Sequence, residues 1–265
     1  MNQINAKTDD TVCPSPTRNY TPNRLPGTRA RIGLIVLSSD PSSEPEWRDM
    51  AQAGGTDIAI HISRIQYNSN CTPEDLRAMA SDMTRAAAML PQSLQLDAIA
   101  YSCTSGTVAI GHQEVVDRIQ AAHPGIPVAT PISGAAGALK HFGASNVAVV
   151  TPYTDLVNDT IQAYLENEGL NITGINGFSL TRDVDMACVP VEAILEAAQE
   201  SITSETEALF LSCTALIVVK DIPWLEEKLG MPVISSNQAM LWETLKSVGY
   251  DKPLSGFGRI LESLG

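Results

Sequence analysis

The 265-residue sequence lacks the short motifs that mark several large classes of enzyme. It contains no G-x-x-x-x-G-K-[ST] phosphate loop, no G-x-G-x-x-G dinucleotide motif and no G-x-S-x-G nucleophile elbow. Its four histidines, His61, His112, His123 and His141, form no i, i+4 pair and have no Cys-x-x-Cys motif near them. We therefore expect a protein that uses neither a metal ion nor a cofactor.

Positive charge and long apolar runs are also scarce. The chain has 17 Lys and Arg against 30 Asp and Glu, a net charge of −13, which repels nucleic acids and anionic lipid surfaces. No apolar run approaches the ~20 residues that span a bilayer, and the first residues, MNQINAKTDD, do not resemble a signal peptide. An odd number of cysteines, 5, fits a reducing compartment. We expect a cytoplasmic protein without nucleic-acid or membrane partners.

Residues 1–29 differ from the rest of the chain. Four prolines lie there among polar residues, and the segment shows neither helical nor strand periodicity. We expect an irregular N-terminal arm that is either disordered or docked on a neighbouring subunit of a homo-oligomer.

After this arm, short apolar runs alternate with amphipathic helical patterns. Such runs are typical of strands buried on both faces of a parallel sheet. They are RIGLIVLSS, DIAIHI, LDAIAYS, IPVAT, NVAVVT, NITGING, EALFLS and MPVIS. One helix is predicted to begin after Thr72 with Pro73 in its first turn, and its apolar stripe is Leu76, Met79, Ala80, Met83 and Ala87. A stripe with the same spacing follows Pro190.

An internal repeat connects the two halves of the chain. RIGLIVLSSD matches NVAVVTPYTD, LDAIAYSCTSG matches EALFLSCTAL, and IPVATPISGAAGAL matches MPVISSNQAMLWETL, in the same order. The repeat predicts an α/β fold of two pseudo-symmetric Rossmann-like domains, each with a mainly four-stranded parallel sheet and with the active site in the cleft between them. We place the first domain at residues 30–132 plus about 237–265 and the second at 133–236.

Two cysteines occupy matching places in this repeat. Cys103 and Cys213 each come directly after a predicted strand and are each followed by Thr. A thiol that faces the N–H groups of a helix N-terminus is expected to have a pKa below its usual ~8.5. Two such groups on opposite walls of a cleft suit a reaction in which one removes a proton and the other delivers one. The alternative is that both are small buried apolar residues.

The other three cysteines have no partner in the repeat. Cys13 lies in the arm, Cys71 precedes a helix cap, and Cys188 lies near the start of a helical pattern. We interpret them as structural or incidental.

The turns that follow the strands supply candidate substrate-binding residues. Thr104, Ser105 and Thr214 offer hydroxyl groups for a carboxylate or an enediolate, although the same residues would also cap the following helices. The first strand ends at Ser39 and Asp40. Tyr153 ends the equivalent strand of the second half, where a phenol either packs at the rim or donates to a developing oxyanion.

The sequence resembles the maleate cis-trans isomerase and arylmalonate decarboxylase branch of the aspartate/glutamate racemase superfamily over nearly everything after residue 30. Proteins of ectoine and hydroxyectoine utilisation belong to the same branch. The resemblance is carried by GLIVLSSD, YSCTSG, NVAVVTPYTDLVND, LSCTALIVVKDIPWLEEKLGMPVISSNQAMLWETL and GFGRIL. It implies a cofactor-independent enzyme with Cys103 and Cys213 as the catalytic pair. It also implies carboxylate donors at Thr104, Ser105 and Thr214 and a further donor at Tyr153.

Two positions set this chain apart within the branch. The decarboxylases have a glycine where Cys103 stands, so a two-thiol isomerisation is favoured over decarboxylation. Maleate isomerases typically have an asparagine where Asp40 stands. A carboxylate at this position would repel a dianion and pair with a substrate ammonium group, which favours an amino acid or its derivative over maleate.

We therefore expect an isomerase of a small carboxylate that needs no cofactor. Racemisation or epimerisation by proton transfer and cis-trans isomerisation by thiol addition both fit the two cysteines. Arylmalonate-type decarboxylation and a binding protein without catalytic activity are the alternatives.

Overall fold

The computed structural model of the chain describes residues 25–55, 57–68 and 70–265. The predicted arm therefore lies mostly outside the described residues. The strands are β1 (Ala30–Leu37), β2 (Ile58–Ile65), β3 (Ala98–Ser102), β4 (Val128–Ala129), β5 (Asn146–Thr151), β6 (Asn171–Gly177), β7 (Ala208–Leu211) and β8 (Val233–Ser235). The helices of the first half are α1 (Ser43–Gln52), α2 (Pro73–Ala78), the 3₁₀ turn η1 (Met79–Asp82), α3 (Met83–Ala88), α4 (Thr104–Ile110), α5 (His112–Gln120) and α6 (Pro131–His141). The helices of the second half are α7 (Asp155–Asn167), α8 (Asp183–Met186), α9 (Val191–Ser201), α10 (Ile222–Leu229), α11 (Ser236–Ser247) and α12 (Arg259–Glu262).

The strands form two parallel four-stranded sheets with the same topology. The strand order is β2-β1-β3-β4 in the first sheet and β6-β5-β7-β8 in the second. All eight predicted strands are present, and the pseudo-symmetric α/β fold is confirmed. Every residue of β1 and β7 is buried, which explains why their sequences are almost entirely apolar. No helix in the described part of the chain is long and apolar enough to cross a membrane.

The helix predicted after Thr72 is interrupted. The Thr72 side chain caps α2 as expected, accepting a hydrogen bond from the Asp75 N–H. The apolar stripe is buried, but the tighter turn η1 separates α2 from α3. One polar side chain competes with the regular helical bonds there, because the Ser81 hydroxyl donates to the Ala78 carbonyl.

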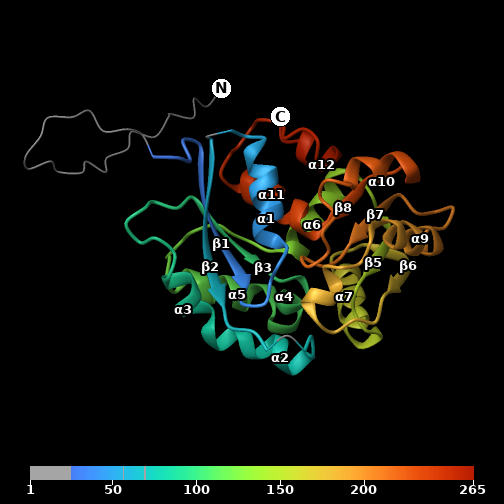
Figure 1. Cartoon of the computed structure of the whole chain (residues 1–265), viewed down its shortest axis with the longest axis horizontal. Coiled ribbons are helices and arrows are strands. Elements are labelled where there is room, and N and C mark those ends of the chain that lie inside the picture. The colour runs from blue at the N-terminus through green and yellow to red at the C-terminus, as the bar shows by residue number, and fades with distance from the viewer. Residues whose placement is uncertain (1–24, 56, 69) are drawn as a thin grey trace, which may run out of the picture.

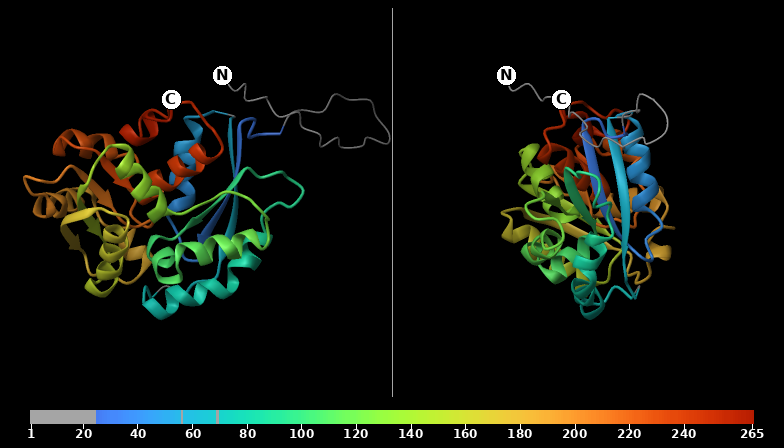
Figure 2. Two further views of the ribbon diagram at one scale, coloured as in Figure 1. Left: turned by 180° about the vertical axis from the view of Figure 1, so that it is seen from behind. Right: turned by 90° about the vertical axis from the view of Figure 1, so that its left-hand side faces the viewer.

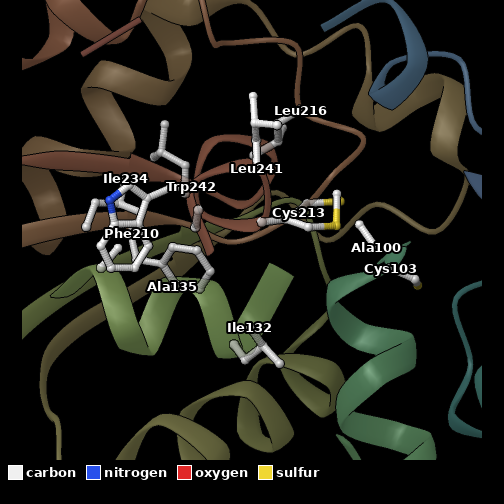
Figure 3. Packing of buried hydrophobic residues seen from close by; sticks show 14 of the residues in the cluster. Ala100, Cys103, Ile132, Ala135, Phe210, Cys213, Leu216, Ile234, Leu241 and Trp242 are labelled. Atoms are coloured by element: carbon white, nitrogen blue, oxygen red, sulfur yellow. The ribbon is translucent and has the colours of Figure 1, made fainter. Parts of the chain in front are cut away.

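Helices α6 and α11 join the two halves (Figures 1 and 2). They pack against each other, and each also reaches across: α11 contacts β3, β4 and α1 of the first half, and α6 contacts β8 of the second. Figure 3 shows Ala135 of α6 in one apolar cluster with Phe210, Ile234 and Trp242. The predicted domain division, with its residue bounds, remains a prediction.

Gly134 sets how closely these two helices approach. A Cβ atom at this position would lie 2.5 Å from the Ala239 carbonyl oxygen on α11, whereas a Cβ at Gly137 on the same helix would meet its nearest atom, in the Trp242 ring, at 3.4 Å.

We expect Gly134→Ala to lower the free energy of unfolding by ~1–3 kcal/mol through overpacking. Urea denaturation measures this change. Gly137→Ala is the matched control and should be neutral or slightly stabilising, because alanine favours a helix by up to ~1 kcal/mol over glycine. Equal effects of the two substitutions would contradict the close approach.

Candidate active site

A cavity lies where the carboxyl ends of strands from both sheets meet. It encloses about 340 Å³ not filled by protein atoms, part of it open to solvent. Only about 20 Å³ of this space can be reached by the centre of a water molecule, so the cavity is small in this structure. The lining residues are Leu37, Asp40, Tyr67, Cys71, Cys103, Ser105, Tyr153, Asp183, Cys213, Thr214 and Ala215. The structure thus brings residues from the two halves of the repeat to one site.

Cys103 lies at the N-terminus of helix α4, directly after β3. Its sulfur caps the helix by accepting a hydrogen bond from the Gly106 N–H, with an Sγ–N distance of 3.2 Å. A Cβ at position 106 would lie 2.7 Å from this sulfur, so glycine leaves the room that the thiol occupies. The thiol is 4% exposed and faces the cavity.

Cys213 has a related but different environment. It follows β7, and its sulfur accepts a hydrogen bond from the Ala215 N–H at 3.3 Å. The Tyr153 hydroxyl also hydrogen-bonds this sulfur. The chain after Cys213 forms turns and does not become helical until α10 begins at Ile222. Figure 3 shows Cys213 facing the end of α4 at which Cys103 lies.

The predicted lowering of the cysteine pKa is wrong. Burial raises the pKa of Cys103 to about 12, although the Gly106 N–H opposes this change. Burial likewise raises the pKa of Cys213, against the hydrogen bonds from Tyr153 and Ala215. The predicted N–H groups are present, but removing the thiolate from water has the larger effect. Both cysteines are therefore neutral thiols at pH 7 in this structure.

Four of the six predicted substrate-binding residues line the cavity: Asp40, Ser105, Tyr153 and Thr214. Ser39 does not line it, but its hydroxyl donates to the carboxylate of Asp183, which does. Thr104 does not line it either. Its buried hydroxyl hydrogen-bonds that of Ser236 at the start of α11, at 2.9 Å, so it joins the two halves instead of facing a ligand.

Several lining residues were not predicted from the sequence, and the most polar of them follow strands β2 and β6. Tyr67 and Cys71 come after β2, and Asp183 comes after β6. The interpretation of Cys71 as structural or incidental is wrong insofar as its thiol lines the cavity. Its backbone φ of +47° is unusual for a residue other than glycine, and the Tyr67 hydroxyl accepts its N–H. The carboxyl ends of these two strands were the available signal, because such ends meet at one edge of a parallel sheet.

A buried carboxylate holds the Cys213 turn against the first half. Glu46 on α1 accepts hydrogen bonds from the N–H groups of Val218 and Val219 at 2.7 and 2.9 Å and from the Asn237 side chain. The Asn237 amide also donates to the Thr214 carbonyl. Helix α1 and the segment that carries Cys213 are therefore fixed relative to each other.

Within the described residues, no group of three or more His, Cys, Asp or Glu side chains is arranged to hold a metal ion. The chemistry that the lining residues themselves offer is that of thiols, two phenols, hydroxyls and carboxylates.

A model of the arylmalonate decarboxylase family matches residues 62–261. The chain belongs to this family. Among similar proteins, this family member is 26% identical to a maleate isomerase of Nocardia farcinica, over 87% of its own length and 95% of the relative's. It is 30% identical to the arylmalonate decarboxylase of Bordetella bronchiseptica, over 52% of its own length and 59% of the relative's.

A solved structure of the Nocardia farcinica maleate cis-trans isomerase is also similar. It has a TM-score of 0.81 and 25% identity, and the match covers 88% of this chain and 98% of the other. That protein is a cysteine-to-serine mutant with a covalently bound succinylcysteine intermediate. The comparisons confirm the expected family and fold. They also support the expected cysteine-dependent isomerase, with decarboxylation as a related alternative.

The raised pKa of the two thiols predicts slow alkylation. Iodoacetamide reacts with the thiolate, so Cys188, which is exposed, should be modified at pH 7 well before Cys103 and Cys213. Peptide mass spectrometry over time resolves each cysteine, and modification of Cys103 should accelerate as the pH is raised. Modification of Cys103 at pH 7 as fast as that of Cys188 would contradict the neutral buried thiol.

Glu46 predicts a pH dependence of stability. Burial raises its pKa to about 7 in the folded protein. The folded state therefore keeps the proton up to about pH 7, whereas the unfolded chain releases it near pH 4.5. The free energy of unfolding should therefore fall as the pH rises between these values, by about 3 kcal/mol at most. Urea denaturation at pH 5 and pH 8 measures the fall. Glu46→Gln, which does not titrate, should remove it, and an unchanged pH dependence in this variant would show that other groups cause it.

Proposed function

We propose that this chain is a cysteine-dependent cis-trans isomerase of a small carboxylate, with Cys103 and Cys213 as the two reacting groups. The observation that carries the proposal is that two thiols from matching places in the two sheets line one cavity, each with a backbone N–H on its sulfur. The cysteine-linked intermediate of the related maleate isomerase supports the addition of a cysteine sulfur to the substrate.

The reaction requires one cysteine as thiolate and the other as thiol. The thiolate adds to one carbon of the double bond, and the electron pair of that bond moves to the neighbouring carbon beside the carboxylate. The second thiol protonates this carbon and becomes a thiolate. The former double bond is now a single carbon–carbon bond, and rotation about it changes the configuration. The second thiolate then removes a proton from the same carbon, the double bond re-forms and the first sulfur leaves as a thiolate.

The other residues of the cavity have supporting roles in this scheme. The hydroxyls of Ser105 and Thr214 can hold the substrate carboxylate, whose negative charge grows after sulfur addition. Tyr153 hydrogen-bonds Cys213 and so stabilises the thiolate form of that residue. Racemisation would use the same two thiols, but a proton would pass between opposite faces of one carbon, without a carbon–sulfur bond.

The location and pathway of the enzyme are further parts of the proposal. A site with two catalytic thiols requires a reducing environment, so we place the enzyme in the cytoplasm. A role in ectoine or hydroxyectoine utilisation is proposed on the sequence resemblance alone.

Proton NMR in deuterium oxide tests this function on a panel of amino acids, their acylated forms and maleate. A new olefin signal indicates cis-trans isomerisation, whereas deuterium beside the carboxylate without such a signal indicates racemisation.

Cys103→Ser and Cys213→Ser should each lower the rate at least ~100-fold, because each removes a group that bonds to carbon or moves its proton. Cys188→Ser is the control and should retain activity, because this residue is exposed and does not line the cavity. Full activity in either of the first two variants would refute the two-thiol mechanism.

A further inference from the structure

The cavity that contains the two thiols carries an unusual charge distribution. Two carboxylates, Asp40 and Asp183, line it, and no Lys, Arg or His occurs among its described lining residues. A site built for a dianionic substrate would be expected to combine its neutral donors with cations and to present no carboxylate.

Asp183 is a buried carboxylate without a cationic partner. It is 8% exposed, and the Ser39 hydroxyl donates to its Oδ2 atom. In the described part of the chain, no donor is hydrogen-bonded to Oδ1 and no cation is ion-paired with this side chain. A buried carboxylate of this kind is costly unless something compensates its charge. Because Asp183 lines the cavity, a ligand is able to supply that compensation.

Asp40 is held at the start of helix α1. Its carboxylate accepts hydrogen bonds from the N–H groups of Ser42 and Ser43, each at 2.8 Å, and from both of their hydroxyls. This set of donors fixes the position of the carboxylate. Arg64 contacts the same segment, but its guanidinium is directed to the backbone carbonyls of Leu37 and Asp40 and to Glu44. Asp40 therefore adds a fixed negative charge to the rim of the cavity.

The titration of the buried groups agrees with this picture. Burial raises the pKa of Asp183, and the charge of Asp40 raises it further. The charge of Asp183 in turn raises the pKa of both Cys103 and Cys213. A cation in the cavity would lower the pKa of all three groups and so favour the reactive thiolate, whereas a dianion would raise them further.

We propose that the substrate of this site is a carboxylate that also carries an ammonium group, and that its positively charged nitrogen binds against Asp183 with Asp40 nearby. Its carboxylate would then lie toward the hydroxyls of Ser105 and Thr214. The inference rests on the proposed isomerase function and narrows its substrate class: zwitterions are accepted, and dicarboxylate dianions are disfavoured.

Two small probes of equal chain length test the inference without requiring turnover. Succinate and 4-aminobutyrate both have four carbons, and they differ in whether the second end is a carboxylate or an ammonium group. Their dissociation constants are measured by calorimetry and by protection of Cys103 from iodoacetamide. The wild-type protein should bind 4-aminobutyrate at least about 10-fold more tightly than succinate, a difference of about 1.4 kcal/mol.

Asp183→Asn should reverse this preference, because the amide removes the negative charge and retains an oxygen for the Ser39 hydroxyl. Asp185→Asn is the matched control. Asp185 lies on the same short helix, but it is paired with Arg182 at the surface and does not line the cavity. This variant should behave like the wild type.

Tighter or equal binding of succinate by the wild type overturns the inference, as does failure of both probes to bind. Weaker binding of succinate by Asp183→Asn also overturns it, because a protonated Asp183 would then be the donor to a substrate carboxylate. None of these results affects the proposed isomerase, which is tested separately through the cysteine variants and the NMR panel.

Discussion

The site depends on one geometric constraint: two parallel sheets present the carboxyl ends of their strands to the same small space. Neither half alone contains the cavity, because Cys103 comes from the first sheet and Cys213 from the second. The crossed helices α6 and α11 hold this arrangement, and the close approach at Gly134 fixes the distance between them. The hydrogen bonds of Glu46 then fix the Cys213 segment to α1.

Burial governs the chemistry of this space. The sulfurs of Cys103 and Cys213 each accept a backbone N–H, yet the thiols stay protonated because exclusion of water outweighs one or two hydrogen bonds. The same exclusion leaves the charge of Asp183 uncompensated by the protein. Reactivity in such a site depends on what the substrate brings, so binding of the correct charge and activation of the thiol are coupled.

Much of this arrangement could be predicted from the sequence. Short apolar runs identified all eight strands, including the half-buried edge strands β2 and β6, and the ordered repeat paired Cys103 with Cys213. The rest depends on tertiary contacts that no local pattern encodes. The loops after β2 and β6 carry no matching motif, so Cys71 and Asp183 were not expected at the cavity. Thr104 was predicted to bind the substrate because a threonine hydroxyl can donate to a carboxylate. Its hydroxyl instead hydrogen-bonds that of Ser236, which is distant in the chain.

The two copies of the repeat have not kept the same surroundings for their sulfur atoms. The sulfur of Cys103 caps a helix, whereas the sulfur of Cys213 lies in a turn and hydrogen-bonds a tyrosine. Equivalent groups would exchange roles freely when a reaction runs backwards, as interconversion of mirror images demands. Unequal groups allow a division of labour, in which one sulfur is suited to attack on carbon and the other to carrying hydrogen.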